Sequence, residues 1–517
     1  MIHKMKKIYI ALFLSTAVAF SSCDMDIPQE GVITVENSLE TKADCAKFMN
    51  TIYNNLRSYT AGGYISKSDL QMDQFVGTVN NGNRNMLFSS ASVTAGDGDV
   101  TSIFASMYYA INNCNFFIPG AQAIIEKGEL FDQDLEVIKY NIGEAKFARA
   151  YFYWYLLDHF CPAYTSANAS TPDLGMPIVL TYDPSADRSK YPGRSTLQGL
   201  VDQINKDLSE AYTAIKYYED NVSMENVVPC ATRINSYAVE ALQARVALIT
   251  GDYTTALNKA EDVIGSQKFA LCEGDDYKAI WTDDEGTELI FVPFGNKTEV
   301  SSVPATGSAW LTNDDKNTSD FIPTPEAFTA FGSKDIRRSA FFTIYAFEFE
   351  GTSAQGLAFN KYPGNTIFNQ GNENPIKNKP KPFRTSELYL IAAEAAAANN
   401  QLAEANAYLN ELRAARIAGY TNVDYNASAI MTQIRNERYK ELIGEGFRMS
   451  DLRRWGLGFT RTCDYTTLGL SPTLNSFIQP NSLNVTYTPG YYMYVWPIPQ
   501  AEMDVNPQLK GHQNTGY

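Results

Sequence analysis

The feature that most constrains this chain is a helical hairpin near its C-terminal third. Residues 385–417 read TSELYLIAAEAAAANNQLAEANAYLNELRAARI. Apolar residues recur at the i, i+3, i+4, i+7 spacing of one helix face over 388–396, and a second apolar face covers 405–412. Asn399-Asn400 separates the two faces, and asparagine tolerates the left-handed conformation that ends a helix. The stretch predicts two helices with an alanine-rich interface, which lets their backbones approach closely.

Such a hairpin cannot bury its apolar faces alone, so we expect further copies. Residues 238–264, AVEALQARVALITGDYTTALNKAEDVI, align with it so that Ala244 matches Ala393. Gly251-Asp252 supplies the helix stop and the next N-cap. The register resembles the tetratricopeptide repeat, but the copies are far apart. We therefore predict scattered helix pairs with long inserts, and a chance match between two alanine-rich hairpins is the alternative.

The N-terminus has the pattern of a bacterial lipoprotein signal. A lysine-rich start is followed by an apolar run over 8–20 and by Ser21-Ser22, which is typical of a secretory signal peptide. Cys23 comes next, which predicts cleavage before it and acylation of its thiol. Residues 1–22 are then the signal peptide, and the polar stretch 23–38 is a membrane tether.

The rest of the chain, 39–517, is predicted to form one mainly α-helical domain. Helical patterning marks a tetratricopeptide-like scaffold, whereas stretches rich in Gly, Asn, Asp and Ser mark loop-rich inserts that we expect to bind the ligand, with a few short strands such as ELIFVPFG. The scaffold covers about 39–60, 103–265 and 383–456, and the inserts cover about 60–102 and 277–382.

Charge and cysteine content narrow the class of protein. The 517 residues carry 42 Lys+Arg against 58 Asp+Glu, a net charge of −16, and this acidic balance argues against nucleic acid as a partner. Six cysteines remain beyond Cys23 and none forms a CxxC pair, so their spacing does not fix any pairing. Cys45 and Cys114, both in predicted helices, are the favoured pair if one disulfide forms.

The sequence offers little for catalysis or metal binding. Once the signal peptide has left, His159 and His512 are the remaining histidines, too few for a histidine-dependent triad or a multi-histidine zinc site. No GxSxG, Walker or GxGxxG motif is present, and nothing singles out a carboxylate pair for glycoside hydrolysis. We expect no enzyme and no cofactor. A structural calcium ion at Asp97-Gly98-Asp99 is the alternative to a plain turn, which is favoured because the full EF-hand pattern is missing.

A helix over 434–454 carries ten charged residues, and it looks like an active site. Mixed charges at i, i+3 and i+4 are more often a salt-bridged surface, so we predict a structural role there.

Several segments, taken together and in order, resemble the SusD/RagB-like outer-membrane lipoproteins of Bacteroidetes. They are GEAKFARAYFYWYLL (143–157), RSTLQGLVDQINKDLSEA (194–211), ALQARVALITGDYTTAL (241–257), ELIFVPFG (288–295), FRTSELYLIAAEA (383–395), IRNERYKELIGEGFRMSDLRRWG (434–456) and PIPQAEMDVNPQL (497–509). The resemblance implies a non-catalytic, cell-surface glycan-binding lipoprotein. It also implies delivery of oligosaccharides to a SusC-like TonB-dependent outer-membrane transporter, over which the protein acts as a lid. The hairpin at 385–417 then supports docking to the barrel.

Sugar recognition needs flat aromatic rings flanked by hydrogen-bonding groups. Trp310 stands in polar loop sequence and is the best stacking candidate, with a core position as an even alternative, whereas Trp154, Trp281, Trp455 and Trp496 are predicted to be core. The other insert offers further candidates: Asp73, Gln74, Asn81, Arg84 and Phe88.

Two other functions stay open at this point. A SusD-like import protein for peptides or other polymers would use the concave helical face. A surface glycoside hydrolase would need a defined carboxylate pair and is the weaker alternative.

Overall fold

The computed structural model describes residues 38–79, 82–223, 225–310, 319–368 and 376–517. The predicted signal peptide, Cys23, most of the predicted tether and Asn81 lie outside the described residues. Residues Thr41–Tyr517 form one compact unit. No helix in the described part of the chain is both long and apolar enough to cross a bilayer.

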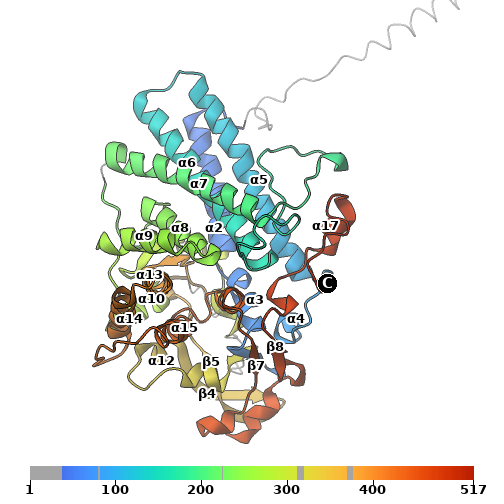
Figure 1. The fold of residues 1–517 in the computed structure, drawn as a ribbon, viewed down its shortest axis with the longest axis vertical. Helices are drawn as coiled ribbons and strands as arrows, with labels where there is room; N and C mark the ends of the chain where they lie inside the picture. The colour runs from blue at the N-terminus through green and yellow to red at the C-terminus, as the bar shows by residue number, and fades with distance from the viewer. Residues whose placement is uncertain (1–37, 80–81, 224, 311–318, 369–375) are drawn as a thin grey trace, which may run out of the picture. The chain divides into compact units, whose positions relative to one another are not determined.

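Four long helices make the N-terminal part of the scaffold (Figure 1): α2 (Lys42–Tyr59), α5 (Gly98–Glu126), α6 (Asp132–Phe160) and α7 (Leu197–Tyr218). Asp97 precedes α5, and its carboxylate accepts hydrogen bonds from the backbone N–H of Asp99 and Val100 in the first turn. Asp97 is therefore the N-cap of this helix.

Both predicted hairpins form: α8 (Ser236–Thr250) with α9 (Tyr253–Gly265), and α13 (Thr385–Ala398) with α14 (Leu402–Arg416). Their turns use the expected residues, since Gly251 has φ 77° and Asn400 has φ 62°, both left-handed. Helix α13 packs against α8 and α9, so the two hairpins lie side by side (Figure 1). The mainly helical fold predicted from the sequence is confirmed.

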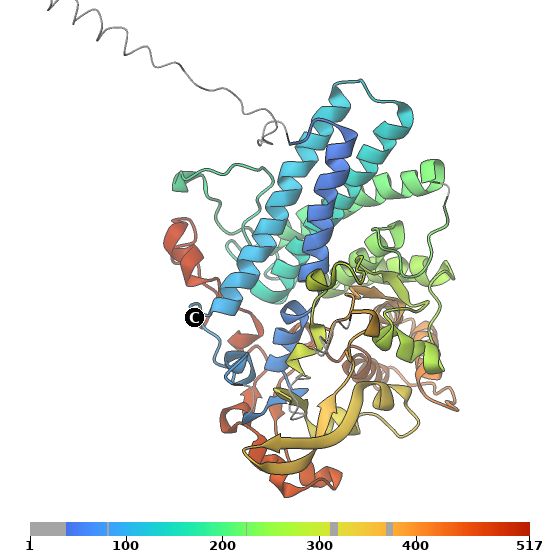
Figure 2. The same cartoon turned by 180° about the vertical axis from the view of Figure 1, so that it is seen from behind.

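The described strands form four antiparallel pairs: β1 (Phe75–Gly77) with β3 (Phe321–Pro323), β2 (Leu289–Phe291) with β6 (Phe383–Arg384), β4 (Phe342–Phe349) with β5 (Thr352–Phe359), and β7 (Phe459–Arg461) with β8 (Val485–Tyr487). The longest pair, β4–β5, is the curved hairpin at the bottom of Figure 2. The β1–β3 pair joins the two predicted inserts, in the register Val76 opposite Ile322.

Shorter helices connect these elements. The α-helices are α3 (Gly63–Gln71), α4 (Met86–Ser89), α10 (Gly274–Thr282), α11 (Pro325–Thr329), α12 (Ile336–Phe341), α15 (Ile430–Glu441), α16 (Arg448–Trp455) and α17 (Gln500–Val505). Single 3-10 turns lie at Arg188–Lys190, Val300–Ser302, Thr306–Ala309, Thr366–Phe368, Tyr465–Leu468, Pro472–Phe477, Pro480–Ser482 and Tyr492–Tyr494, and a π-helical turn lies at Glu219–Ser223.

Arg461 of β7 ties the C-terminal segment to the first insert. Its guanidinium donates through Nη1 to the carbonyls of Leu70, Met72 and Phe75 at 3.1, 2.8 and 3.0 Å, and through Nη2 to the carbonyl of Ser89. Arg461 is 1% exposed. One side chain thus supplies hydrogen bonds to four backbone carbonyls, which belong to α3, the residue after it, β1 and α4.

The predicted charged helix is two helices, α15 and α16, separated by Gly444 and Gly446, which have φ 77° and 86°. Its charges contribute to a buried ionic core and not to the salt-bridged surface that the sequence predicts. Glu441 is fully buried, and its carboxylate meets Arg337 at 3.0 Å, Arg384 at 3.1 Å and Arg416 at 3.1 Å. Burial alone would raise the pKa of Glu441, but the three guanidiniums outweigh it and hold that pKa well below its ordinary value. The arginines come from other segments of the chain, so the pattern within one helix did not reveal that these charges are enclosed.

The cysteines outside the signal region are unpaired. Cys45 and Cys114 are both buried free thiols, so the disulfide favoured from the sequence does not form. Burial raises the pKa of Cys114 to about 12, which keeps this thiol protonated.

Candidate functional site

Trp310 lies in the core of the second insert. Its indole is 1% exposed and packs against the rings of Phe75, Phe359 and Tyr362, at centroid distances of 5.3, 5.1 and 5.9 Å. No ring face is left for a pyranose, so this structure favours the core position that the sequence had left open. Trp154, Trp281 and Trp496 are also buried, as predicted, whereas Trp455 is partly exposed.

Asp73 and Gln74 serve to join the first insert to the scaffold. The Asp73 carboxylate receives two hydrogen bonds from Arg448, at 2.8 and 2.7 Å. Gln74 is 1% exposed and donates through Nε2 to the carbonyl of Tyr439. Both side chains are thus engaged in contacts within the fold.

Arg84 and Phe88 lie in different environments, one exposed and one buried. The Arg84 side chain is 63% exposed and forms an ion pair with buried Asp320 at 2.7 Å. Phe88 is 1% exposed and packs edge-on against Trp496. The structure therefore brings the two inserts together but does not gather the predicted residues on one open surface. The place of Asn81 lies outside the described residues.

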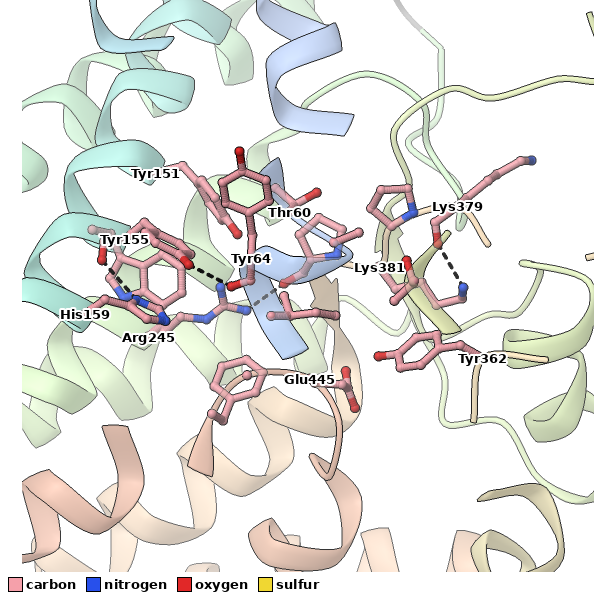
Figure 3. A pocket seen from close by; sticks show the side chains of 18 residues that line it. Thr60, Tyr64, Tyr151, Tyr155, His159, Arg245, Tyr362, Lys379, Lys381 and Glu445 are labelled. Atoms are coloured by element: carbon pink, nitrogen blue, oxygen red, sulfur yellow. Dashed lines mark hydrogen bonds between the residues drawn. The ribbon is translucent and has the colours of Figure 1, made fainter. Parts of the chain in front are cut away.

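A cavity lies where α6 and α3 meet the segments 379–382 and 445–447 (Figure 3), and we call it the junction cavity. Tyr155 donates to the carbonyl of Tyr64 at 2.8 Å, and Arg245 donates to the carbonyl of Pro382 at 2.6 Å. Arg245 also pairs with Glu387 at 2.6 Å. These bonds fasten the scaffold to the inserts.

The junction cavity is too small for a sugar. Its volume is about 40 Å³, which admits water, whereas ligand pockets measure about 300–1,000 Å³. Three of its polar atoms have no hydrogen-bond partner among the described residues: Trp154 Nε1, His159 Nε2 and Thr306 Oγ1. Burial lowers the pKa of His159 to about 4, so its imidazole is neutral at physiological pH. The cavity is suited to a few water molecules that would satisfy these atoms.

A much larger, open cleft of about 650 Å³ runs along α2. Its walls are α2, the start of α6, Thr232-Arg233 and residues 294–299, and we call it the α2 cleft. Figure 2 shows α2 alongside α5, with the chain that follows β2 near the C-terminal end of α2. The cleft lies within the size range of ligand sites.

Helix periodicity explains why α2 lines this cleft with two rows of side chains. Residues four apart share a helix face, so Ala46, Asn50 and Asn54 form one row and Met49, Tyr53 and Arg57 the other. Asn50 and Asn54 are exposed. The first row presents two amides to solvent, and an amide both donates and accepts hydrogen bonds.

Phe294 supplies an aromatic surface to the α2 cleft. It follows β2 and is 49% exposed, although its neighbours Val292 and Pro293 are buried. Arg57 Nη1 donates to the Phe294 carbonyl at 2.9 Å and to the Glu299 carboxylate at 3.0 Å, and Arg57 Nη2 donates to Asn54 at 3.0 Å. The arginine thus fixes the phenylalanine backbone beside the amide row.

The opposite wall is built around Arg233. Its Nε donates to Glu144 at 3.0 Å, its Nη2 donates to Asn141 at 3.0 Å, and its guanidinium lies 4.5 Å from the centre of the Tyr140 ring. Glu144 is fully buried, whereas the Arg233 side chain is 50% exposed. The buried carboxylate therefore holds a guanidinium at the surface of the cleft.

A second open cleft, of about 410 Å³, lies between α5, residues 177–192 and α17. Its two tyrosines are only partly exposed, and their hydroxyls donate to backbone carbonyls, Tyr108 to Pro177 and Tyr191 to Ser185. This cleft offers a less accessible aromatic surface than Phe294 does. Among the described residues, no group of three or more His, Cys, Asp or Glu is arranged to hold a metal ion.

Sequence reasoning missed Phe294 because it treated ELIFVPFG as a strand and searched for tryptophan. The available signal was Pro293, which cannot donate to a strand ladder and so marks the end of β2. The side chain after that end is free to leave the core. The amide row at Asn50 and Asn54 was equally visible as the polar face of the first helix.

Comparisons with known proteins agree on one family. A sequence model of the SusD family matches residues 295–517, and a model described as starch-binding and associating with the outer membrane matches residues 33–248. A SusD-like protein of Formosa agariphila is 23% identical over 490 residues, which cover 84% of this chain and 83% of that protein.

Solved structures show the same fold. A SusD superfamily protein from Bacteroides thetaiotaomicron superposes with a TM-score of 0.75 at 24% identity, over 90% of this chain and 98% of that one. A SusD-like carbohydrate binding protein from Bacteroides vulgatus gives a TM-score of 0.71 at 19% identity, over 91% and 98% of the two chains.

Proposed function

The chain belongs to the SusD family, and we propose that it captures an oligosaccharide in the α2 cleft and releases it unchanged. The exposed ring of Phe294 beside the amide row of α2 is the observation that carries this proposal. An aromatic ring covers the apolar face of a pyranose, and amides and guanidinium groups hydrogen-bond its hydroxyls.

Capture would be reversible and would break no bond. Glycoside hydrolysis requires two carboxylates that flank the scissile bond. Among the described residues that line the α2 cleft, Glu299 is the one carboxylate, and it is paired with Arg57. The cleft chemistry therefore supports binding in preference to hydrolysis.

The place of capture follows from family and sequence together. The match to a family described as associating with the outer membrane and the lipoprotein signal before Cys23 support a lipid-anchored protein of the cell surface. By family resemblance, the partner that receives the sugar is a SusC-like TonB-dependent transporter, which the protein covers as a lid.

Substitution of Phe294 tests the site. We expect Phe294→Ala to weaken binding of the best ligand from a panel of neutral hexasaccharides about tenfold, which corresponds to about 1.4 kcal/mol of stacking. Isothermal titration calorimetry on the purified full chain measures this loss. Phe131→Ala is the matched control, because Phe131 is 84% exposed and does not line the α2 cleft.

Two results would contradict the proposal. Equal loss of affinity in Phe294→Ala and Phe131→Ala would exclude the α2 cleft as the binding site. Release of shorter sugars during incubation with any ligand of the panel would show an enzyme.

A further inference from the structure

The positive side chains of the α2 cleft stand out against the charge of the whole chain. The protein has a net charge of −16, yet the described residues that line this cleft include two arginines, Arg57 and Arg233, and a single carboxylate, Glu299, while the carboxylate that pairs with Arg233 is buried behind the cleft wall. We infer that the cleft selects an acidic oligosaccharide, one whose sugars carry carboxylate or sulfate groups. The inference rests on the proposed function and specifies its ligand class.

Arg57 is already arranged to bind an anion next to the aromatic ring. It holds the carboxylate of Glu299 at 3.0 Å while it also holds the backbone of Phe294. The Arg57 side chain is 12% exposed and that of Glu299 is 48% exposed. The glutamate therefore occupies, from the solvent side, the position that an acidic group of a bound sugar would take.

Exchange of Glu299 for a ligand acid is energetically modest. An ion pair with one solvent-exposed member contributes little to stability, so its rupture costs little. The glutamate also lies in an irregular segment, beside the 3-10 turn that begins at Val300.

Arg233 offers a second anchor across the cleft. Its Nε and Nη2 bind Glu144 and Asn141, whereas no bond to a described residue involves Nη1. Its guanidinium lies over the Tyr140 ring and is held by a buried carboxylate, so a ligand need not order it. Preorganised guanidinium groups are preferred for carboxylate and sulfate-like anions because of their planar, forked donors.

Matched ligands test the inference on the purified full chain. Hexagalacturonate is compared with its methyl ester, and a sulfated carrageenan hexasaccharide with its desulfated form, by calorimetry at low and moderate salt. We expect at least one acidic member to bind about tenfold more tightly than its neutral partner, with a preference that falls as salt rises.

Charge variants in the cleft give opposite results. Arg57→Gln should bring the ratio of acidic to neutral affinity close to one, whereas Glu299→Gln should raise it about threefold by removing the competing carboxylate. Lys127→Gln removes one positive charge from an exposed position outside the cleft and should leave the ratio unchanged. If Arg57→Gln fails to fold, Glu299→Gln at an exposed position still shows whether loss of the carboxylate raises or lowers the ratio of acidic to neutral affinity.

The outcomes separate this inference from the proposed function. If the neutral forms bind as tightly as the acidic ones and Phe294→Ala weakens both, the acidic preference is wrong and the binding site stands. If neither matched pair of sugars binds while a neutral sugar of the panel binds through Phe294, the inference is likewise overturned. If no sugar depends on Phe294, both proposals fail.

Discussion

The α2 cleft and the buried ionic core around α15 each contain an arginine–glutamate ion pair with the same N–O distance. Arg57 meets Glu299 at 3.0 Å, and Arg337 meets Glu441 at 3.0 Å. The first glutamate side chain is 48% exposed and the second is fully buried. Water screens the first pair and replaces either partner when the pair opens, but it cannot reach the second. Equal geometry therefore indicates an exchangeable contact in one region and an obligatory one in the other.

The strongest test of this contrast is Glu441→Gln. The substitution leaves three buried guanidinium groups, those of Arg337, Arg384 and Arg416, without one of their carboxylates. We expect the free energy of unfolding to fall by about 3–5 kcal/mol, measured by urea denaturation. A loss below about 1 kcal/mol would show that the remaining acids compensate for Glu441. It would also show that burial does not determine how much the ion pair contributes to the free energy of unfolding.

Trp310→Ala should cause the next largest loss, about 3 kcal/mol of unfolding free energy, because it opens a space among Phe75, Phe359 and Tyr362. Thermal unfolding and sugar binding are both measured, with affinity referred to the folded fraction. Unchanged stability together with lost binding would restore the stacking role predicted from the sequence.

Asp69 links the comparison to pH. Burial raises its pKa from 3.8 to about 7, although its carboxylate accepts hydrogen bonds from the backbone N–H of Gly446 and Arg448. Between these values the unfolded chain has released the proton and the folded chain retains it, so stability falls as pH rises, by at most about 1.4 kcal/mol per pH unit. We expect Asp69→Asn to remove this slope.

Urea denaturation from pH 4 to 8 measures the difference between Asp69→Asn and the unsubstituted chain. The acids of the ionic core act in the opposite direction, since their lowered pKa values, such as that of Glu445, give stability that is lost as pH falls. The variant isolates Asp69 because both proteins keep those acids. Parallel stability curves would contradict the raised pKa.

The smallest effect is expected for Glu299→Gln. Because this carboxylate is half exposed, its removal should change the free energy of unfolding by less than about 1 kcal/mol. The same urea titration applies, with Glu441→Gln as the reference. A loss as large as that of Glu441→Gln would show that exposure does not explain the different stability contributions of the two ion pairs.

Local features of the fold were predictable, because they depend on a few neighbouring residues. Gly251 and Asn400 end helices in the left-handed conformation, and their positions located both hairpins correctly. The β4–β5 hairpin turns at Glu350 and Gly351, which have φ 47° and 77°, and the glycine was its local sequence signal. This stretch falls within the insert that the sequence predicts to be loop-rich.

Burial was predicted correctly for three of the tryptophans, but it was not predictable for single side chains whose burial depends on partners far along the chain. Trp310 stands in polar sequence but is enclosed by Phe75 and Phe359. Glu441 looked like a surface charge until arginines from three other segments surrounded it. Phe294 looked like a core strand residue, and only the tertiary fold leaves it exposed.

Arg461 has a consequence for the genetics of this protein. It supplies donors to the backbone of the first insert across 391 positions of sequence, from Leu70. A ribosome that has made the first insert must therefore add most of the chain before that insert can be completed. A stop codon shortly before position 461 would not merely trim a tail, since it would leave an early segment unfinished. Nonsense alleles that end the chain shortly before Arg461 should thus behave like null alleles.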